Sequence, residues 1–348
     1  MAFSPLVRLL LASIVLLAFA LAELRAPNPS GALIWTYISL IQLLFGFAAA
    51  SRFGTAEPRV RELVWPAIAC GCLAYSAMAA IFALSPHPSD FDWQYFGLAV
   101  SNVRQIGFYM TVGSLAAIGS AVGASLPKAV FYSAAATVMM ALAFWTGSRG
   151  AAIASIAAVA AGFVAFRPMR TIQGALTALI PIPLGALLSA PLPRPMVVFG
   201  VGRMVESLQA VSPDAISGFR LKMWESAWRA FLQRPWFGYG AGQFGNVAPQ
   251  PQAVYVHPHN VLLQSLIQWG AVGTVLCLGL AAVAVGHIRV ALKKDQTAIL
   301  PAFLVCIGLL VFSLYDGALF HVYPVMMFGF ALAFIIGSDQ QSQAARQS

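Results

Sequence analysis

The sequence predicts an all-α membrane protein, a bundle of about ten transmembrane helices with one long loop on the outer side. Hydrophobic residues make up 60% of the 348 residues and charged residues only 9%. A soluble domain has about 25% charged residues, because it must cover itself with a hydrated surface. The mean hydropathy is +0.80. With so few charges, the chain is expected to be solvated by lipid, and its length fits a single bundle.

Ten apolar runs approach the length of roughly 20 residues that a helix needs to cross a bilayer. They lie at 6–22, 31–50, 63–84, 105–123, 127–146, 150–166, 171–190, 260–286, 298–315 and 317–337. Pro181 and Pro183 are expected to kink the seventh run. The runs divide the chain into about seven helices in 1–190, a loop at 191–259, about three helices in 260–337 and a tail at 338–348, which we expect to be disordered.

The distribution of Lys and Arg predicts that both termini are cytoplasmic. With the N-terminus inside, short inner segments hold 11 of the 20 Lys and Arg residues, as the excess of positive charge in cytoplasmic loops requires. The long loop at 191–259 then lies outside. A cleaved signal peptide at the first run is an alternative that leaves this loop where it is. The net charge of +9 is scattered in short clusters, so we expect no nucleic-acid partner.

The outer loop contains a segment with helical periodicity. Its apolar residues recur at spacings of three and four, which predicts an amphipathic helix on the bilayer surface; they are Leu221, Trp224, Trp228 and Phe231. Ser217 is the expected N-cap and Pro235 the expected stop. Arg220 falls in the first turn, where free N–H groups and the helix dipole favour a phosphate. We therefore interpret Arg220 as a phosphate-binding residue rather than one that reaches the headgroups.

The end of the loop carries the best candidate for a general base. The run His257-Pro-His-Asn260 leads directly into an apolar helix. Imidazole titrates near neutral pH, and His259, next to the helix start, is the better placed of the two histidines. Asn260 is expected to cap the helix or to orient the imidazole. No Asp, Glu or Cys nearby completes a metal site, so we expect none.

Glycines and arginines supply the remaining candidates. Gly240, in Phe237-Gly-Tyr-Gly-Ala-Gly242, is expected to belong to a tight turn that lets backbone approach backbone or ligand. Arg104 and Arg149 lie at the outer ends of predicted helices. A cation at such a place either reaches the headgroups or holds an anion.

These residues resemble the O-antigen ligase and polymerase superfamily of bacterial envelope glycan enzymes. The resemblance rests on three segments that occur in order over about 130 residues. They are Ser148-Arg149-Gly150, then Arg220-x-x-x-Trp224 running through Arg234-Pro-Trp-Phe-Gly-Tyr-Gly240, then His257-Pro-His-Asn260 with Leu263, Gln264 and Gly270.

The resemblance implies a C-type glycosyltransferase fold in the bacterial cytoplasmic membrane, with its active site facing the periplasm. Such enzymes take a glycan from undecaprenyl pyrophosphate and pass it to an acceptor hydroxyl, without a nucleotide sugar, metal or other cofactor. The acceptor is lipid A–core or a protein for a ligase, and the growing glycan for a polymerase; the sequence does not decide between them. The family's roles carry over onto Arg220, His259 and Arg149.

Taken together, the residues predict a metal-independent, inverting transfer. His259 is expected to deprotonate the acceptor, with Arg220, Arg149, Arg104 and Arg203 on the pyrophosphate, and His257, Asn260, Trp224 and Gly240 in support. Two readings compete with an enzyme: a transporter of lipid-linked glycan, which is expected to carry polar groups at mid-membrane, and a structural scaffold, which would tolerate the joint loss of Arg220 and His259.

Overall fold

The protein is almost entirely helical. The computed structural model describes residues 4–95, 97–98, 100, 102–196, 199–208, 220–248, 255–293 and 297–347. Within these residues no strand occurs, and the β-structure is limited to a bridge between Gly97 and Val100. The larger helices are α1 (Pro5–Leu24), α2 (Pro29–Thr55), α3 (Pro58–Leu84), α4 (Arg104–Ala121), α5 (Leu126–Trp145), α6 (Arg149–Ala165), α7 (Ile172–Leu179), α8 (Pro181–Ser189), α9 (Gly200–Leu208), α11 (Arg220–Gln233), α13 (Val261–Leu292), α14 (Leu300–Tyr315) and α15 (Val322–Gln347).

Each predicted membrane run overlaps one of these helices, or two in the case of the seventh run. That run is divided into α7 and α8 at Pro181, the first residue of α8, so the predicted kink is confirmed. Among the described residues, five helical segments are long and apolar enough to cross a membrane, and four shorter helices are also apolar. The protein is therefore an integral membrane protein, while the number of ten crossings stays a prediction.

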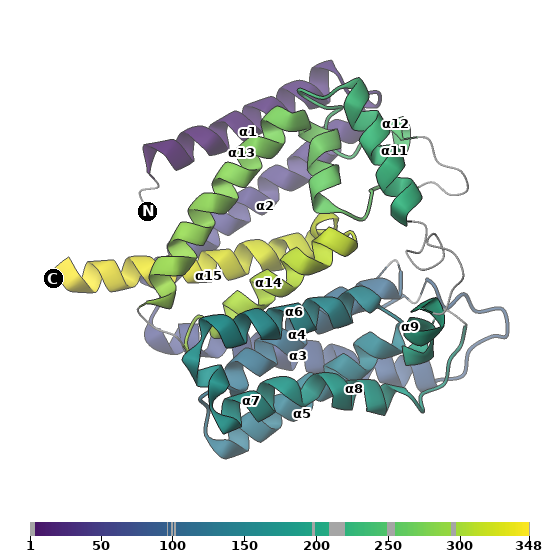
Figure 1. The fold of residues 1–348 in the computed structure, drawn as a ribbon, viewed down its shortest axis with the longest axis vertical. Helices are drawn as coiled ribbons and strands as arrows, with labels where there is room; N and C mark the ends of the chain where they lie inside the picture. The colour runs from purple at the N-terminus through teal and green to yellow at the C-terminus, as the bar shows by residue number, and fades with distance from the viewer. Residues whose placement is uncertain are drawn as a thin grey trace. The chain divides into compact units, whose positions relative to one another are not determined.

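The chain forms two compact units, and Figure 1 labels their helices. The first unit comprises Met1–Gly54, Ala210–Val290 and Ser313–Ser348. The second comprises Thr55–Gln209 and Ala291–Phe312. The candidate residues divide between them, because the amphipathic helix and the histidines lie in the first unit and the more N-terminal arginines in the second.

The second unit is built around α4. Almost every side chain of this helix is buried, with α3 and α5 as its main neighbours. Glycines make the close packing possible: a Cβ on Gly113 would overlap Cys72 and Met139, and one on Gly119 would overlap Pro301. Because these glycines carry no side chain, neighbouring residues can pack directly against the backbone of α4, and the helix can lie at the centre of its unit.

In the first unit, α1 packs along α13 and α2 along α15. Gly273 and Gly279 of α13 face Leu17 and Leu10 of α1. Phe53 of α2 makes edge-to-face contacts with two phenylalanines of α15, Phe330 and Phe334. The helix α15 runs from Val322 to Gln347, while the expected disorder of the tail at 338–348 stays a prediction.

The helix α13 is broken at Gly270, where the backbone adopts φ 63° and ψ −167°. The carbonyls of Ile267 and Gln268, freed by the break, accept hydrogen bonds from the N–H groups of Tyr239 and Gly240 at 2.8 and 2.9 Å. The N–H groups of Ala271 and Val272 donate to Pro235 and Trp236 at 2.7 and 3.2 Å. These hydrogen bonds to the loop satisfy backbone groups of α13. Without a partner, such groups would be energetically unfavourable in an apolar medium.

Gly240 belongs to the segment that repairs this break. Its φ is 93°, and Gly238 and Gly242 also have positive φ. A Cβ on Gly238 would overlap the carbonyl groups of Ile267 and Gln268. The predicted tight turn is therefore present, and its partner is the backbone of α13.

The amphipathic helix α11 is present, and it also has a face that is buried in the protein. Leu221 and Trp228 are exposed, and Phe231 is buried. The smaller side chains Met223, Ala227 and Ala230 form a buried face. This face packs on a cluster completed by Tyr239, Phe244, Ala248 and Ile267. Small side chains let the helix approach closely, which the pattern of large residues did not reveal. The bilayer-surface location of the exposed apolar residues stays a prediction, and the expected N-cap Ser217 lies outside the described residues.

Candidate active site

His259 occupies an unusual backbone conformation at the entrance to α13. Its φ is 53°, in the left-handed region that residues other than glycine rarely adopt. Its backbone N–H donates to Nδ1 of His257 at 3.2 Å. Strained backbone of this kind persists only where the surroundings hold it in place, and it concentrates at functional sites.

The imidazole of His259 is bound to a carboxylate that the sequence analysis did not select. Nδ1 of His259 lies 2.6 Å from Oδ1 of Asp316, in the short connection between α14 and the 3₁₀ turn η2 (Ala318–Phe320). The backbone N–H of Gly317 donates to the same carboxylate oxygen at 2.8 Å. Oδ1 of Asp316 thus interacts with two groups, Nδ1 of His259 and the N–H of Gly317. The hydrogen bond to Gly317, the next residue, fixes the position of the carboxylate.

Arg220 binds the other oxygen of this carboxylate. Its NH2 group lies 3.0 Å from Oδ2 of Asp316, and the two side chains are only 10% and 14% exposed. The guanidinium carbon also lies 4.6 Å from the centre of the Tyr315 ring. The role predicted for Arg220, contact with a pyrophosphate, stays a prediction; the structure adds an ion pair that holds Asp316.

The charge state of Asp316 fixes the tautomer of His259. Burial alone raises the pKa of the carboxyl, but the hydrogen bond and charge of His259, the charge of Arg220 and the Gly317 N–H together bring it well below its ordinary value. An ionised carboxylate only accepts hydrogen bonds, so Nδ1 of His259 carries a proton. Nε2 is then the nitrogen left to take a proton from a substrate, the arrangement that a carboxylate imposes on a catalytic histidine.

His257 is a buried imidazole that stays neutral. Burial lowers its pKa well below the ordinary value, and the neighbouring imidazoles of His259 and His321 lower it further, against the opposite effect of Asp316. Its ring centroid is 4.5 Å from that of Phe320. A Cβ on Gly317 would overlap the ring. Because Nδ1 of a neutral imidazole can accept, His257 is able to hold the N–H of His259.

Asn260 and Trp224 hold the same loop at two further points. Oδ1 of Asn260 accepts from the N–H groups of Leu262 and Leu263 at 3.0 and 3.1 Å, so Asn260 caps α13, one of its two predicted roles. Its Nδ2 donates to the carbonyl of Leu314 at 3.0 Å. Nε1 of Trp224 donates to the carbonyl of Pro258 at 3.0 Å, which ties α11 to the loop. The imidazole itself is oriented by Asp316, not by Asn260.

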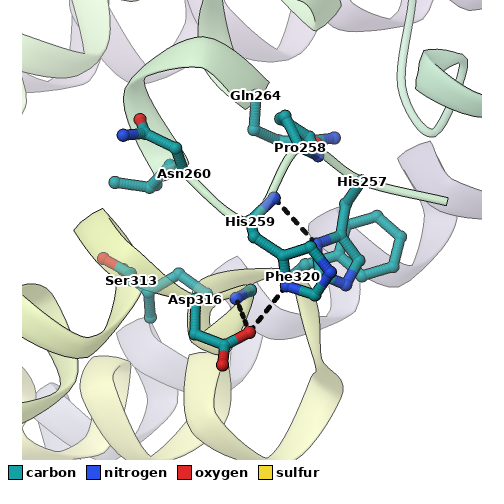
Figure 2. A pocket seen from close by; sticks show the side chains of 11 residues that line it. His257, Pro258, His259, Asn260, Gln264, Ser313, Asp316 and Phe320 are labelled. Carbon is teal, nitrogen blue, oxygen red and sulfur yellow. Dashed lines mark hydrogen bonds and ion pairs between the residues drawn. The ribbon is translucent and has the colours of Figure 1, made fainter. Parts of the chain in front are cut away.

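A small pocket lies against these residues, and Figure 2 shows His259 at its centre with Asp316 and Gln264 to either side. Its lining residues are His257, Pro258, His259, Asn260, Val261, Gln264, Ser313, Asp316, Gly317, Leu319 and Phe320. Among the described residues, no three His, Cys, Asp or Glu side chains are grouped so that they could hold a metal ion.

The other predicted arginines gather within the second unit. Arg104 begins α4 and Arg149 begins α6. One turn beyond Arg104, a Cβ on Gly107 would meet Oγ of Ser148 at 2.7 Å, which brings the starts of these two helices together. NH1 of Arg203 donates to the carbonyl of Gly147 at 3.3 Å, in the turn that precedes Arg149. Three of the predicted anion-binding residues therefore lie at one end of the second unit.

Comparison with known proteins decides the family of the central part of the chain. Residues 134–278 match the family model described as O-antigen ligase. This match supports the O-antigen ligase superfamily. The resemblance predicted from the sequence is confirmed, and members of this family are glycosyltransferase-like enzymes, ligases or polymerases.

The comparisons with individual proteins add little. No curated protein matches the chain. A chain from a solved structure described as "Structural coordination of polymerization and crosslinking by a peptidoglycan synthase complex" is similar with a TM-score of 0.46 and 15% identity. The similarity covers 98% of this chain and 99% of that one.

Asp316 lies beyond the O-antigen ligase segment, and the sequence analysis missed it. It is the single residue between the predicted ninth and tenth membrane runs, at 298–315 and 317–337. An ionisable residue flanked so closely by apolar helices is energetically unfavourable in the membrane. It is a functional candidate for that reason alone. That signal was sufficient to select it.

Proposed function

We propose that the protein is an O-antigen ligase-like glycosyltransferase that moves a glycan from undecaprenyl pyrophosphate to an acceptor hydroxyl, at the periplasmic face of the bacterial cytoplasmic membrane. The observation that carries the proposal is the 2.6 Å contact between His259 and Asp316. It supplies an oriented imidazole at the end of a segment from a family of glycosyltransferase-like enzymes.

In the proposed reaction, Nε2 of His259 takes the proton of the acceptor hydroxyl as its oxygen attacks the anomeric carbon of the donor. The bond from that carbon to the pyrophosphate oxygen breaks, and the pyrophosphate leaves with the electron pair on the opposite face. The configuration at the anomeric carbon is inverted. Asp316 stabilises the imidazolium that forms, and Arg220 in turn holds Asp316.

The leaving group gathers negative charge as the bond breaks, and fixed cations lower the barrier to that step. The grouping of Arg104, Arg149 and Arg203 in the second unit supports these residues as pyrophosphate ligands. Arg220, which lies in the first unit, is also proposed as a pyrophosphate ligand. Planar guanidinium groups suit this task because each can give two parallel hydrogen bonds to a phosphate.

Transfer by the His259→Ala variant tests the proposal. With purified protein in liposomes, a lipid-linked glycan donor and an acceptor, the variant is expected to transfer glycan about 10²–10⁴-fold more slowly, the usual effect of losing a general base. Transfer at the rate of the unaltered protein would remove His259 from the mechanism. Movement of labelled lipid-linked glycan across the bilayer, without any transfer product, would replace the enzyme with a transporter.

The acceptor is open to a genetic test. Deletion of the gene is expected to leave long glycan chains on the lipid carrier if the protein is a ligase, as proposed. Accumulation of single repeat units would identify a polymerase. Analysis of the surface glycan distinguishes the two outcomes.

A further inference from the structure

Gln264 is a buried amide in the same pocket as the proposed base. It lies in the first turn of α13 and lines the pocket together with His259 and Asp316. The residue is 7% exposed. Both its Oε1 and Nε2 atoms are buried, and neither has a hydrogen-bond partner among the described residues.

An unpaired amide at this place is unfavourable for the fold. Buried polar atoms are nearly always hydrogen-bonded, and each exception calls for an explanation. Removing such an atom is neutral or stabilising when an apolar side chain of the same shape replaces it. A methionine at position 264 would fill the space without that cost. The amide therefore points to a partner that enters the pocket with the substrate.

We propose that Gln264 binds the acceptor and that the acceptor is a sugar with a hydroxyl next to the one that reacts. This inference rests on the proposed function. Oε1 accepts a hydrogen bond from one hydroxyl and Nε2 donates to another, since an amide has one acceptor group and two donors. The reacting hydroxyl is held at the same time by Nε2 of His259.

A phosphate group or a protein acceptor would satisfy the hydrogen-bonding groups of the Gln264 amide less well than a sugar. A phosphate offers only acceptors, so it leaves Oε1 of Gln264 unpaired. The side chain of a serine or threonine acceptor has a single hydroxyl, which the base already engages. The apolar residues Val261, Leu319 and Phe320 also line the pocket, as is usual for a ligand site in which a few polar groups set the orientation.

The Gln264→Met variant separates a role in acceptor binding from a role in the fold. Its melting temperature is expected to equal or exceed that of the unaltered protein, while KM for an oligosaccharide acceptor rises by about tenfold or more, as the loss of a hydrogen bond or two predicts. KM for the lipid-linked donor is expected to stay unchanged. A Gln268→Met variant, one turn further along α13 and outside the pocket, is the matched control and is expected to change neither KM.

Acceptor analogues make the test specific. An analogue that lacks the neighbouring hydroxyl is expected to have a KM about tenfold higher with the unaltered protein, but no penalty with Gln264→Met, because the partner of that hydroxyl is then gone. A lowered melting temperature with unchanged acceptor KM would overturn the inference, as would a change in donor KM alone. A peptide acceptor that is used well and is equally sensitive to Gln264→Met would overturn the sugar as substrate.

Failure of this inference is distinguishable from failure of the proposed function. If His259→Ala is inactive and Gln264→Met has ordinary kinetics, Gln264 is not an acceptor ligand but the glycosyltransferase proposal stands. If the unaltered protein itself transfers no glycan from the lipid-linked donor, the proposed function fails, and this inference with it.

Discussion

The backbone N–H of His259 donates to Nδ1 of His257, 3.2 Å away, and this bond accompanies the left-handed conformation of His259. The bond requires an unprotonated Nδ1 on His257, and burial keeps the imidazole neutral by lowering its pKa. A neutral histidine thus acts as a hydrogen-bond acceptor that positions a second one, the proposed general base.

Replacement of His257 by Asn and by Gln is expected to give different results. Oδ1 of Asn can occupy the place of Nδ1 and accept from His259, so His257→Asn is expected to retain most of the transfer activity. The longer side chain of Gln places its amide near Nε2 instead, so His257→Gln is expected to lose about tenfold or more in kcat, since a small misplacement of a catalytic group is costly. Equal activity of the two variants would argue against the positioning role.

The same residue predicts how stability depends on pH. His257 stays neutral in the fold because its pKa is lowered, whereas in the unfolded chain it takes a proton below about pH 6.5. The unfolded state then binds more protons than the folded one, so stability falls as the pH drops below about 6.5. Thermal unfolding in detergent at pH 5 to 8 measures this slope. The His257→Asn variant is expected to have a shallower slope.

Asp316→Asn is expected to reduce transfer by about 10²–10⁴-fold, close to the loss of the base itself. The carboxylate accepts from His259, Gly317 and Arg220, and the single oxygen of an amide cannot serve all three. The amide NH₂ then faces either Arg220 or Nδ1 of His259, and the second case imposes the wrong tautomer. Glu225→Gln, an exposed acidic position on α11, is the control and is expected to leave kcat unchanged.

The ion pair between Arg220 and Asp316 is accessible to a double-mutant cycle. Arg220→Ala leaves a buried carboxylate without its cation and is expected to lower the free energy of unfolding by about 3–5 kcal/mol. Adding Asp316→Asn is expected to cost much less than its effect in the unaltered protein, because the charge to be compensated is gone. Arg229→Ala breaks an exposed pair with Glu225 and is expected to change stability by less than about 1 kcal/mol. Additive effects at Arg220 and Asp316 would show that the two residues act independently.

Gly317→Ala is expected to impair transfer without adding or removing any charge. A methyl group at this position overlaps the His257 ring, which must then shift together with the loop that carries His259. Because the φ of Gly317 is −80°, the effect is one of space and not of backbone conformation. The prediction is a loss in kcat of at least about tenfold; ordinary kinetics would show that the ring has room to move.

Two glycines of α13 are expected to respond in opposite ways to alanine. Gly270 has positive φ, and its Cβ would overlap the backbone of Trp236, so Gly270→Ala is expected to destabilise the protein by about 1–3 kcal/mol. Gly286 has open space around it, so Gly286→Ala is expected to be neutral or stabilising by up to about 1 kcal/mol. Unfolding by heat or denaturant in detergent compares them.

Much of the fold follows from apolar run lengths. Each predicted run has its helix because a backbone in an apolar medium must satisfy its own hydrogen bonds, and a helix does so locally. The break in α13 could not be predicted in the same way. Its repair depends on hydrogen bonds between Tyr239 and Ile267 and between Ala271 and Pro235, contacts across about 30 residues that no local pattern contains.

Residues of the candidate site could be predicted where their role depends on neighbours in the sequence. Asn260 stands directly before a helix, so its capping role could be read from its position. Asp316 could be paired with His259 only through tertiary structure, because 57 residues separate them. The contact of α11 with the rest of the protein was not predicted, because it is made by small residues such as Ala227 that do not stand out in the sequence.

The separation of His259 from Asp316 has a consequence for biosynthesis. The ribosome must complete α13 and α14 before the carboxylate exists, so a nascent chain holds an imidazole without its partner for the whole of that interval. Only when the last turn of α14 has emerged can the two side chains meet. The pair of side chains is therefore assembled only after α14, and a chain that stops before Asp316 carries every residue of the family segment but lacks the carboxylate that orients His259.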